Sequence, residues 1–61
     1  MADKAIVNEA LKFYNDRKKQ GETMVASSAL WVILKAKGMT KIALAEHEAL
    51  LDELLEKING E

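Results

Sequence analysis

Two glycines, Gly21 and Gly38, interrupt a chain that otherwise has the periodicity of helices. On either side of them apolar residues recur three and four positions apart, and no stretch alternates with period two, so we expect helices and no strands. A glycine just past a helix can take the left-handed conformation that closes its last turn, and Gly60 has such a place near the end of the chain. The sequence predicts a single all-α domain over residues 1–61, with helices at about 4–20, 23–37 and 41–59.

The first and third of these segments are amphipathic, each with one apolar face and charged residues opposite. In the first segment the apolar face comprises Ile6, Val7, Ala10, Leu11, Phe13 and Tyr14. In the third it comprises Leu44, His47, Leu50, Leu51, Leu54, Leu55 and Ile58. We expect both faces to be buried in a common core.

Three polar residues stand where helix N-caps are expected. Asp3, Thr23 and Thr40 precede the three segments, and their side-chain oxygens can accept hydrogen bonds from the free amides of a first turn. Met39 and Leu44 flank the third start at the spacing of a hydrophobic staple.

The middle segment has no charged residue from Thr23 to Leu34. Its apolar positions cover more than half of the helix circumference, which predicts a central helix that two neighbours cannot cover on every side. These positions are Val25, Ala26, Ala29, Leu30, Val32, Ile33 and Leu34. The remaining side carries Met24, Ser27, Ser28, Trp31 and Lys35.

The chain of 61 residues is 49% hydrophobic and contains no cysteine. Disulfides, thiolate zinc sites and cysteine nucleophiles are therefore excluded, and association remains as a source of stability for so small a core. We expect a small three-helix bundle or helical array with short turns, with dimerisation as a way to complete it.

The sequence offers little for catalysis. His47, the only histidine, is expected to be partly buried and hydrogen-bonded to Tyr14 or Ser27. Ser27 and Ser28 lack a glycine-rich oxyanion loop and a carboxylate placed to orient a histidine. The acidic residues of 41–59 are typical of a solvated helix face, without the central glycine of a calcium loop. We expect no enzyme activity, no metal and no cofactor.

Charge is unevenly distributed, with a net of +3 in residues 1–40 and −4 in residues 41–61. The second and third helices, joined around Gly38, permit a nucleic-acid-binding regulator of helix-turn-helix type. Its recognition helix would, however, present four carboxylates that phosphates repel: Glu46, Asp52, Glu53 and Glu56. Nucleic-acid binding is therefore the alternative and is not favoured.

No apolar run approaches the length of about 20 residues that a membrane span requires, and no secretory signal is recognisable, so we expect a cytoplasmic protein. Tryptophan and methionine are enriched in binding hot spots, and small residues beside them let a partner helix approach. We expect a non-enzymatic protein–protein interaction module, in its simplest form a homodimer. Its predicted partner-binding residues are Met24, Ser27, Ser28, Trp31 and Lys35. The alternative is that this side belongs to the internal core.

Overall fold

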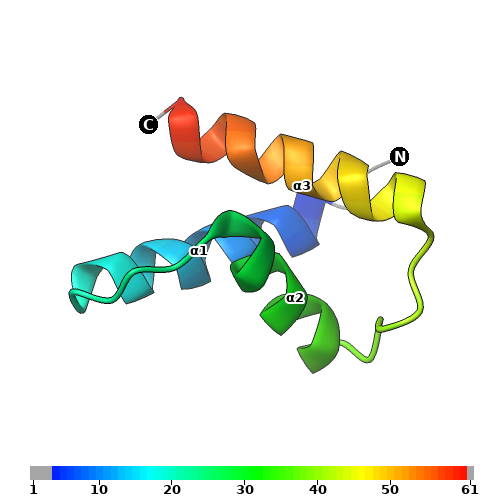
Figure 1. Ribbon diagram of the computed structural model, residues 1–61, viewed down its shortest axis with the longest axis horizontal. Coiled ribbons are helices and arrows are strands. Elements are labelled where there is room, and N and C mark those ends of the chain that lie inside the picture. Colours follow the sequence, from blue (N-terminus) through cyan, green and yellow to red (C-terminus); the bar gives the residue numbers. More distant parts are fainter. Residues whose placement is uncertain (1–3, 61) are drawn as a thin grey trace.

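A computed structural model of the chain describes residues 4–60. These residues form three helices, α1 (Lys4–Lys19), α2 (Ala26–Ala36) and α3 (Leu44–Asn59), and no strand. Each helix packs against the other two. In Figure 1, α1 and α3 both run from right to left, and α2 crosses α1 in this view and runs obliquely downward. The predicted all-α class with three helices is confirmed, and the expected cap Asp3 lies outside the described residues.

The core is a single apolar cluster to which all three helices contribute. Burying these side chains is the main driving force that holds the helices together. The fully buried members are Ile6, Val7, Ala10, Leu30, Leu34, Leu50 and Leu54. In α1 the buried residues fall on the predicted face, and Leu11, Phe13 and Tyr14 of that face are half-buried.

The C-termini of α1 and α2 have the same closing geometry. Gly21 and Gly38 have φ of +81° and +72°, the left-handed region that favours glycine. After α2, the Gly38 N–H donates to the Lys35 carbonyl at 3.1 Å, and the Met39 N–H donates to the Leu34 carbonyl at 2.8 Å. This pair of bonds defines a Schellman motif and satisfies two carbonyls that the helix itself leaves free.

A second Schellman motif follows α1. The Gly21 N–H donates to the Lys18 carbonyl at 3.0 Å, and the Glu22 N–H donates to the Arg17 carbonyl at 3.1 Å. Both predicted glycine stops are thus confirmed. Gly60 differs, because its φ of −80° is helical, and the left-handed cap expected there is wrong.

The expected N-caps of α2 and α3 are wrong as well. α2 begins at Ala26 after Val25, and α3 begins at Leu44 after Ala43, and neither start has a side-chain cap. Thr23 and Thr40 lie outside the helices, and both are exposed. The connections 20–25 and 37–43 are consequently longer than the short turns that the glycines suggested.

Packing against the core explains the late start of α3. Met39 and Ile42, both in the 37–43 connection, pack partly buried against the core cluster. The connection is therefore held extended along the core, and the helix begins only after Ile42 has been placed. The predicted staple between Met39 and Leu44 does not form a buried contact, since the Leu44 side chain is 72% exposed.

The chain is flattened as well as small. Its radius of gyration is 10.9 Å, close to the roughly 10.5 Å expected of a compact chain of this length. Its extents are 32 × 23 × 16 Å, and a single helix with side chains is about 10 Å across. An array this thin has only one internal layer of side chains, so the outward sides of its helices face solvent. Val32, on the outward side of α2, is exposed for this reason.

Candidate interaction surface

Trp31 of α2 and His47 of α3 stack on one another where the two helices meet. Their ring centroids are 4.7 Å apart, and the ring planes are inclined by 28°. Trp31 nevertheless remains 40% exposed, while His47 is half-buried. The Nε2 atom of His47 is buried and has no hydrogen-bond partner among the described residues. The hydrogen bond expected between one ring nitrogen of His47 and Tyr14 or Ser27 is therefore not formed at Nε2.

Three leucines of α3 continue this aromatic pair. Leu44, Leu51 and Leu55 are seven and four residues apart, which places them on the same side of the helix. Leu44 and Leu55 are 72% and 39% exposed, and Leu51 is half-buried against the core. We call Trp31, Leu44, His47, Leu51 and Leu55 the Trp31 surface.

The sequence pattern misplaced Leu44 and Leu55 because it treated the whole apolar face of α3 as core. The helix buries Leu50 and Leu54 completely, and these two residues lie at one edge of that face. The other edge therefore turns outward.

The predicted partner-binding residues do not all lie together. Ser28, Trp31 and Lys35 are three and four residues apart on α2, and all three are exposed. Ser27 is half-buried. Met24 lies in the 20–25 connection, before the helix begins, so it does not stack with Trp31 along α2 as expected.

The Trp31 surface has charges of opposite sign at its two edges. On α2, Lys35 follows Trp31 by one helical turn. On α3, Glu48 and Asp52 follow Leu44 by one and two turns, and both are exposed. The surface therefore runs from a basic edge on α2 to an acidic edge on α3.

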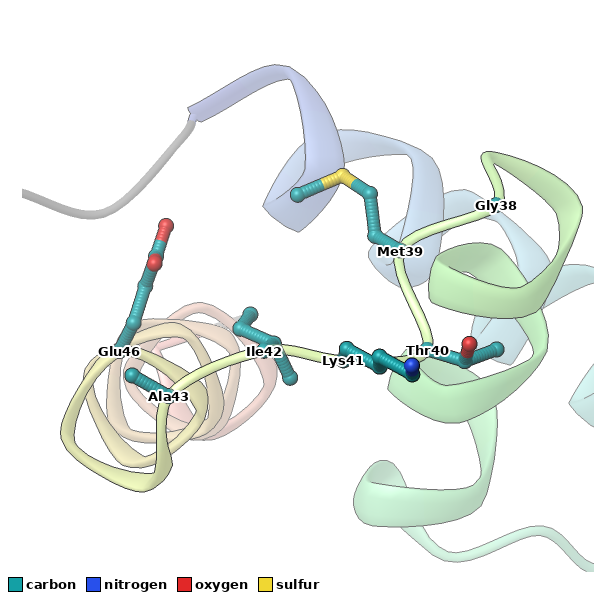
Figure 2. A pocket seen from close by; sticks show the side chains of 7 residues that line it. All are labelled: Gly38, Met39, Thr40, Lys41, Ile42, Ala43 and Glu46. Atoms are coloured by element: carbon teal, nitrogen blue, oxygen red, sulfur yellow. The ribbon is translucent and has the colours of Figure 1, made fainter.

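The 37–43 connection borders a hollow of about 380 Å³ (Figure 2). Among the described residues, Lys41 and Glu46 are the charged ones that line it, and the Met39 and Glu46 side chains stand on the same side of the connection. A second hollow, of about 290 Å³, lies between α1 and α2 beside Phe13 and Ile33. The second hollow is also lined by the charged residues Glu9, Lys12 and Asp16 of α1. In the part of the chain that the structure describes, no histidine or serine lines either hollow.

The basic side chains at the C-terminal end of α1 contact residues of the same helix and of the connection that follows it. The Arg17 guanidinium lies 5.0 Å from the centre of the Phe13 ring and donates to Glu22 at 2.8 Å. The Lys18 ammonium lies 5.6 Å from the centre of the Tyr14 ring. These cations cover the half-buried aromatic rings of α1 and stabilise the end of the helix. A further ion pair joins Lys37 to Glu9 at 2.7 Å.

Within residues 4–60, no group of three or more histidine or acidic side chains is placed to hold a metal ion. The helices of this part of the chain are too short or too polar to cross a membrane. No protein-family model, curated protein or solved structure matches the chain.

Proposed function

We propose that this chain is a non-enzymatic helical interaction module that binds protein through the Trp31 surface, and that it does so in its simplest form as a homodimer. The observation that carries the proposal is the exposure of large apolar side chains from two adjacent helices on one side of the molecule. Trp31, Leu44 and Leu55 are 40%, 72% and 39% exposed.

Covering such a surface with another chain stabilises both partners. Each Å² of apolar area removed from water contributes about 25 cal/mol, and tryptophan is among the residues that dominate interface energetics. Trp31 is also held in place by its stack on His47, so its binding costs less side-chain entropy than that of a freely rotating residue.

The arrangement of charge favours protein over nucleic acid as the partner. A helix-turn-helix needs a short turn and a basic recognition helix. Here the 37–43 connection follows the core at length, and the exposed side of α3 carries Glu46, Glu48 and Asp52. The C-termini of α1 and α2 are well separated in Figure 1, so the basic last turns of these two helices do not form one continuous patch.

Sedimentation equilibrium of the parent and of single variants tests the proposal. We expect the parent to show a mass that rises with concentration toward that of a dimer. Trp31→Glu and Leu44→Glu should each keep the mass at that of a monomer, because each places a charge in the proposed contact. Val32→Glu is the matched control, since Val32 is 41% exposed on the same helix as Trp31 but lies outside the Trp31 surface.

Leu44 is the more informative of the two positions, because its side chain makes little contact within the chain and the variant should fold normally. Circular dichroism confirms the helix content of each variant. A parent that stays monomeric up to millimolar concentration would exclude the homodimer. An equal loss of mass in Val32→Glu would place the contact elsewhere on the molecule.

A further inference from the structure

We infer that the Trp31 surface is covered by a second copy of this chain, related by a two-fold axis that runs along the line of α3 leucines, so that Lys35 of each chain faces Glu48 and Asp52 of the other. This inference rests on the proposed self-association and assigns its geometry. It is carried by the order of charged and apolar residues across the surface.

That order follows from helix geometry, in which four residues turn a side chain by about 40° beyond one full turn. On α3 the series His47, Leu51, Leu55 therefore moves steadily away from α2, against which His47 stacks. The same rotation of about 40° per four residues places Glu48 farther round the helix than Leu44, and Asp52 farther round than Glu48. The carboxylates thus form the edge of the surface that is farthest from α2.

On α2 the same step moves from Trp31 to Lys35. The buried side of this helix is marked by Leu30 and Leu34, and Lys35 lies farther from it than Trp31 does. The sequence of groups across the surface is therefore a basic edge on α2, the Trp31–His47 pair, the leucines, and an acidic edge on α3.

A two-fold axis in the plane of a contact makes the surface meet itself. When the axis runs along the leucines, each edge meets the opposite edge of the partner, so Lys35 faces carboxylates in two symmetric places. When the axis runs across the leucines, the acidic edges face one another, and like charges in contact are unfavourable. The charge pattern selects the first arrangement.

A dimer contact of ordinary size would cover only part of the exposed surface of this chain. The chain exposes 4255 Å², so a standard contact of about 800 Å² per partner would cover about a fifth of it. The formal net charge of −1 opposes the approach of two copies very little. A self-complementary pattern on a nearly neutral chain fits a second copy better than it fits a strongly charged partner.

A charge-swap experiment tests the geometry. One variant is Lys35→Glu and the other is Glu48→Lys with Asp52→Lys. Each variant alone should dimerise about tenfold or more weakly than the parent, because both symmetric contacts become repulsive. An equimolar mixture should regain parent-like association as a one-to-one heterodimer, because both contacts are then attractive again. Lys12→Glu on α1 is the control for a charge reversal outside the surface and should leave dimerisation unchanged.

Sedimentation equilibrium and native mass spectrometry read out both the mass and the composition of the mixture. A parent that dimerises while the swapped variants associate as tightly as the parent would overturn this geometry and leave the proposed function intact. Repulsion in each variant without recovery in the mixture would also overturn it. A monomeric parent would overturn both the geometry and the proposed homodimer.

Discussion

At the scale of single residues, His47 both destabilises and stabilises the fold. Its buried Nε2 atom costs free energy, and the stacking of its ring on Trp31 offsets part of that cost. The ring stacks on Trp31, whereas Nε2 is buried without a hydrogen-bond partner among the described residues. An unsatisfied buried polar atom costs about 1–3 kcal/mol, and an aromatic pair contributes about 0.5–1.5 kcal/mol. The site therefore retains a stabilising contact next to a destabilising one.

Replacing His47 by phenylalanine separates these two effects. His47→Phe keeps an aromatic ring against Trp31 and removes the buried nitrogen, so we expect the free energy of unfolding to rise by about 1 kcal/mol. His47→Asn, which keeps a buried polar group and loses the ring, should lower it. Urea unfolding at pH 8 and one fixed protein concentration measures both variants. A His47→Phe variant less stable than the parent would show that the nitrogen is satisfied.

Gly38 is the residue whose backbone conformation matters most to the 37–43 connection. Its φ is +72°, and no atom lies within 4 Å of the position that a side-chain Cβ would occupy. Gly38→Ala should therefore destabilise the fold by about 1–2 kcal/mol through the backbone alone, since there is no steric clash. D-alanine at this position in a synthetic chain prefers positive φ and should be at least as stable as the parent. Equal unfolding midpoints for the L- and D-alanine forms would contradict this account.

At the scale of elements, the starts of α2 and α3 lack side-chain caps, whereas the ends of α1 and α2 are closed by Schellman motifs. α3 begins after Ala43, whose φ of −62° and ψ of 142° are those of an N-cap but whose side chain cannot accept a hydrogen bond. Glu46 occupies the third position of the helix, where a capping box places its acidic residue. A single substitution at Ala43 is therefore sufficient to complete the N-cap of α3.

Ala43→Ser should complete that capping box and raise the free energy of unfolding by about 0.5–2 kcal/mol. Thr40→Ala should change it by less than about 0.5 kcal/mol, because Thr40 is exposed and outside the helix. In a Glu46→Ala background the gain from Ala43→Ser should shrink, since one of the two reciprocal bonds is lost. Thermal and urea unfolding measure the stability of these four variants (Ala43→Ser, Thr40→Ala, Glu46→Ala and the double variant) and of the parent. A large loss for Thr40→Ala would restore Thr40 as the cap.

The sequence was sufficient for the number of helices and for the ends of α1 and α2, because a Schellman motif is formed by local hydrogen bonds around one glycine. The starts of α2 and α3 could not be predicted in this way. The packing of Met39 and Ile42 against the core delays the start of α3, and that contact is tertiary. Thr40 stands where an N-cap is expected and therefore indicated a helix start, but the packing of the 37–43 connection against the core moves the start of α3 to Leu44.

The apolar faces of the helices were likewise predicted only in part. The face of α1 was predicted, because this helix lies against both others on one side. The residues of the apolar face of α3 were predicted as a set, but the sequence does not indicate which edge of that face meets the other two helices. Complete burial of Leu50 and Leu54 fixed the direction and left Leu44 outside. Trp31 was predicted on the outward side of α2, but its partner His47 was not.

At the scale of the whole molecule, the small thickness of the helical array explains why large apolar side chains are exposed. Three helices in an array 16 Å thick have one layer of core between them, and the chain has more large apolar side chains than that layer holds. Trp31, Leu44 and Leu55 of this surplus belong to the Trp31 surface, which has Lys35 at one edge and carboxylates at the other, whereas Val25 and Val32 are exposed elsewhere. The central claim is that this surface is where the chain associates.

A dilution series of ¹H–¹⁵N correlation spectra tests that claim most directly, because it reports association residue by residue without any substitution. On dilution from millimolar to micromolar concentration, we expect the amide signals of Ser28, Trp31, Leu44, Glu48 and Leu55 to shift together along one binding isotherm. The signals of Asn8 and Lys12 on the outward side of α1 should stay in place. Shifts confined to α1, or spectra that do not change with concentration, would contradict the account.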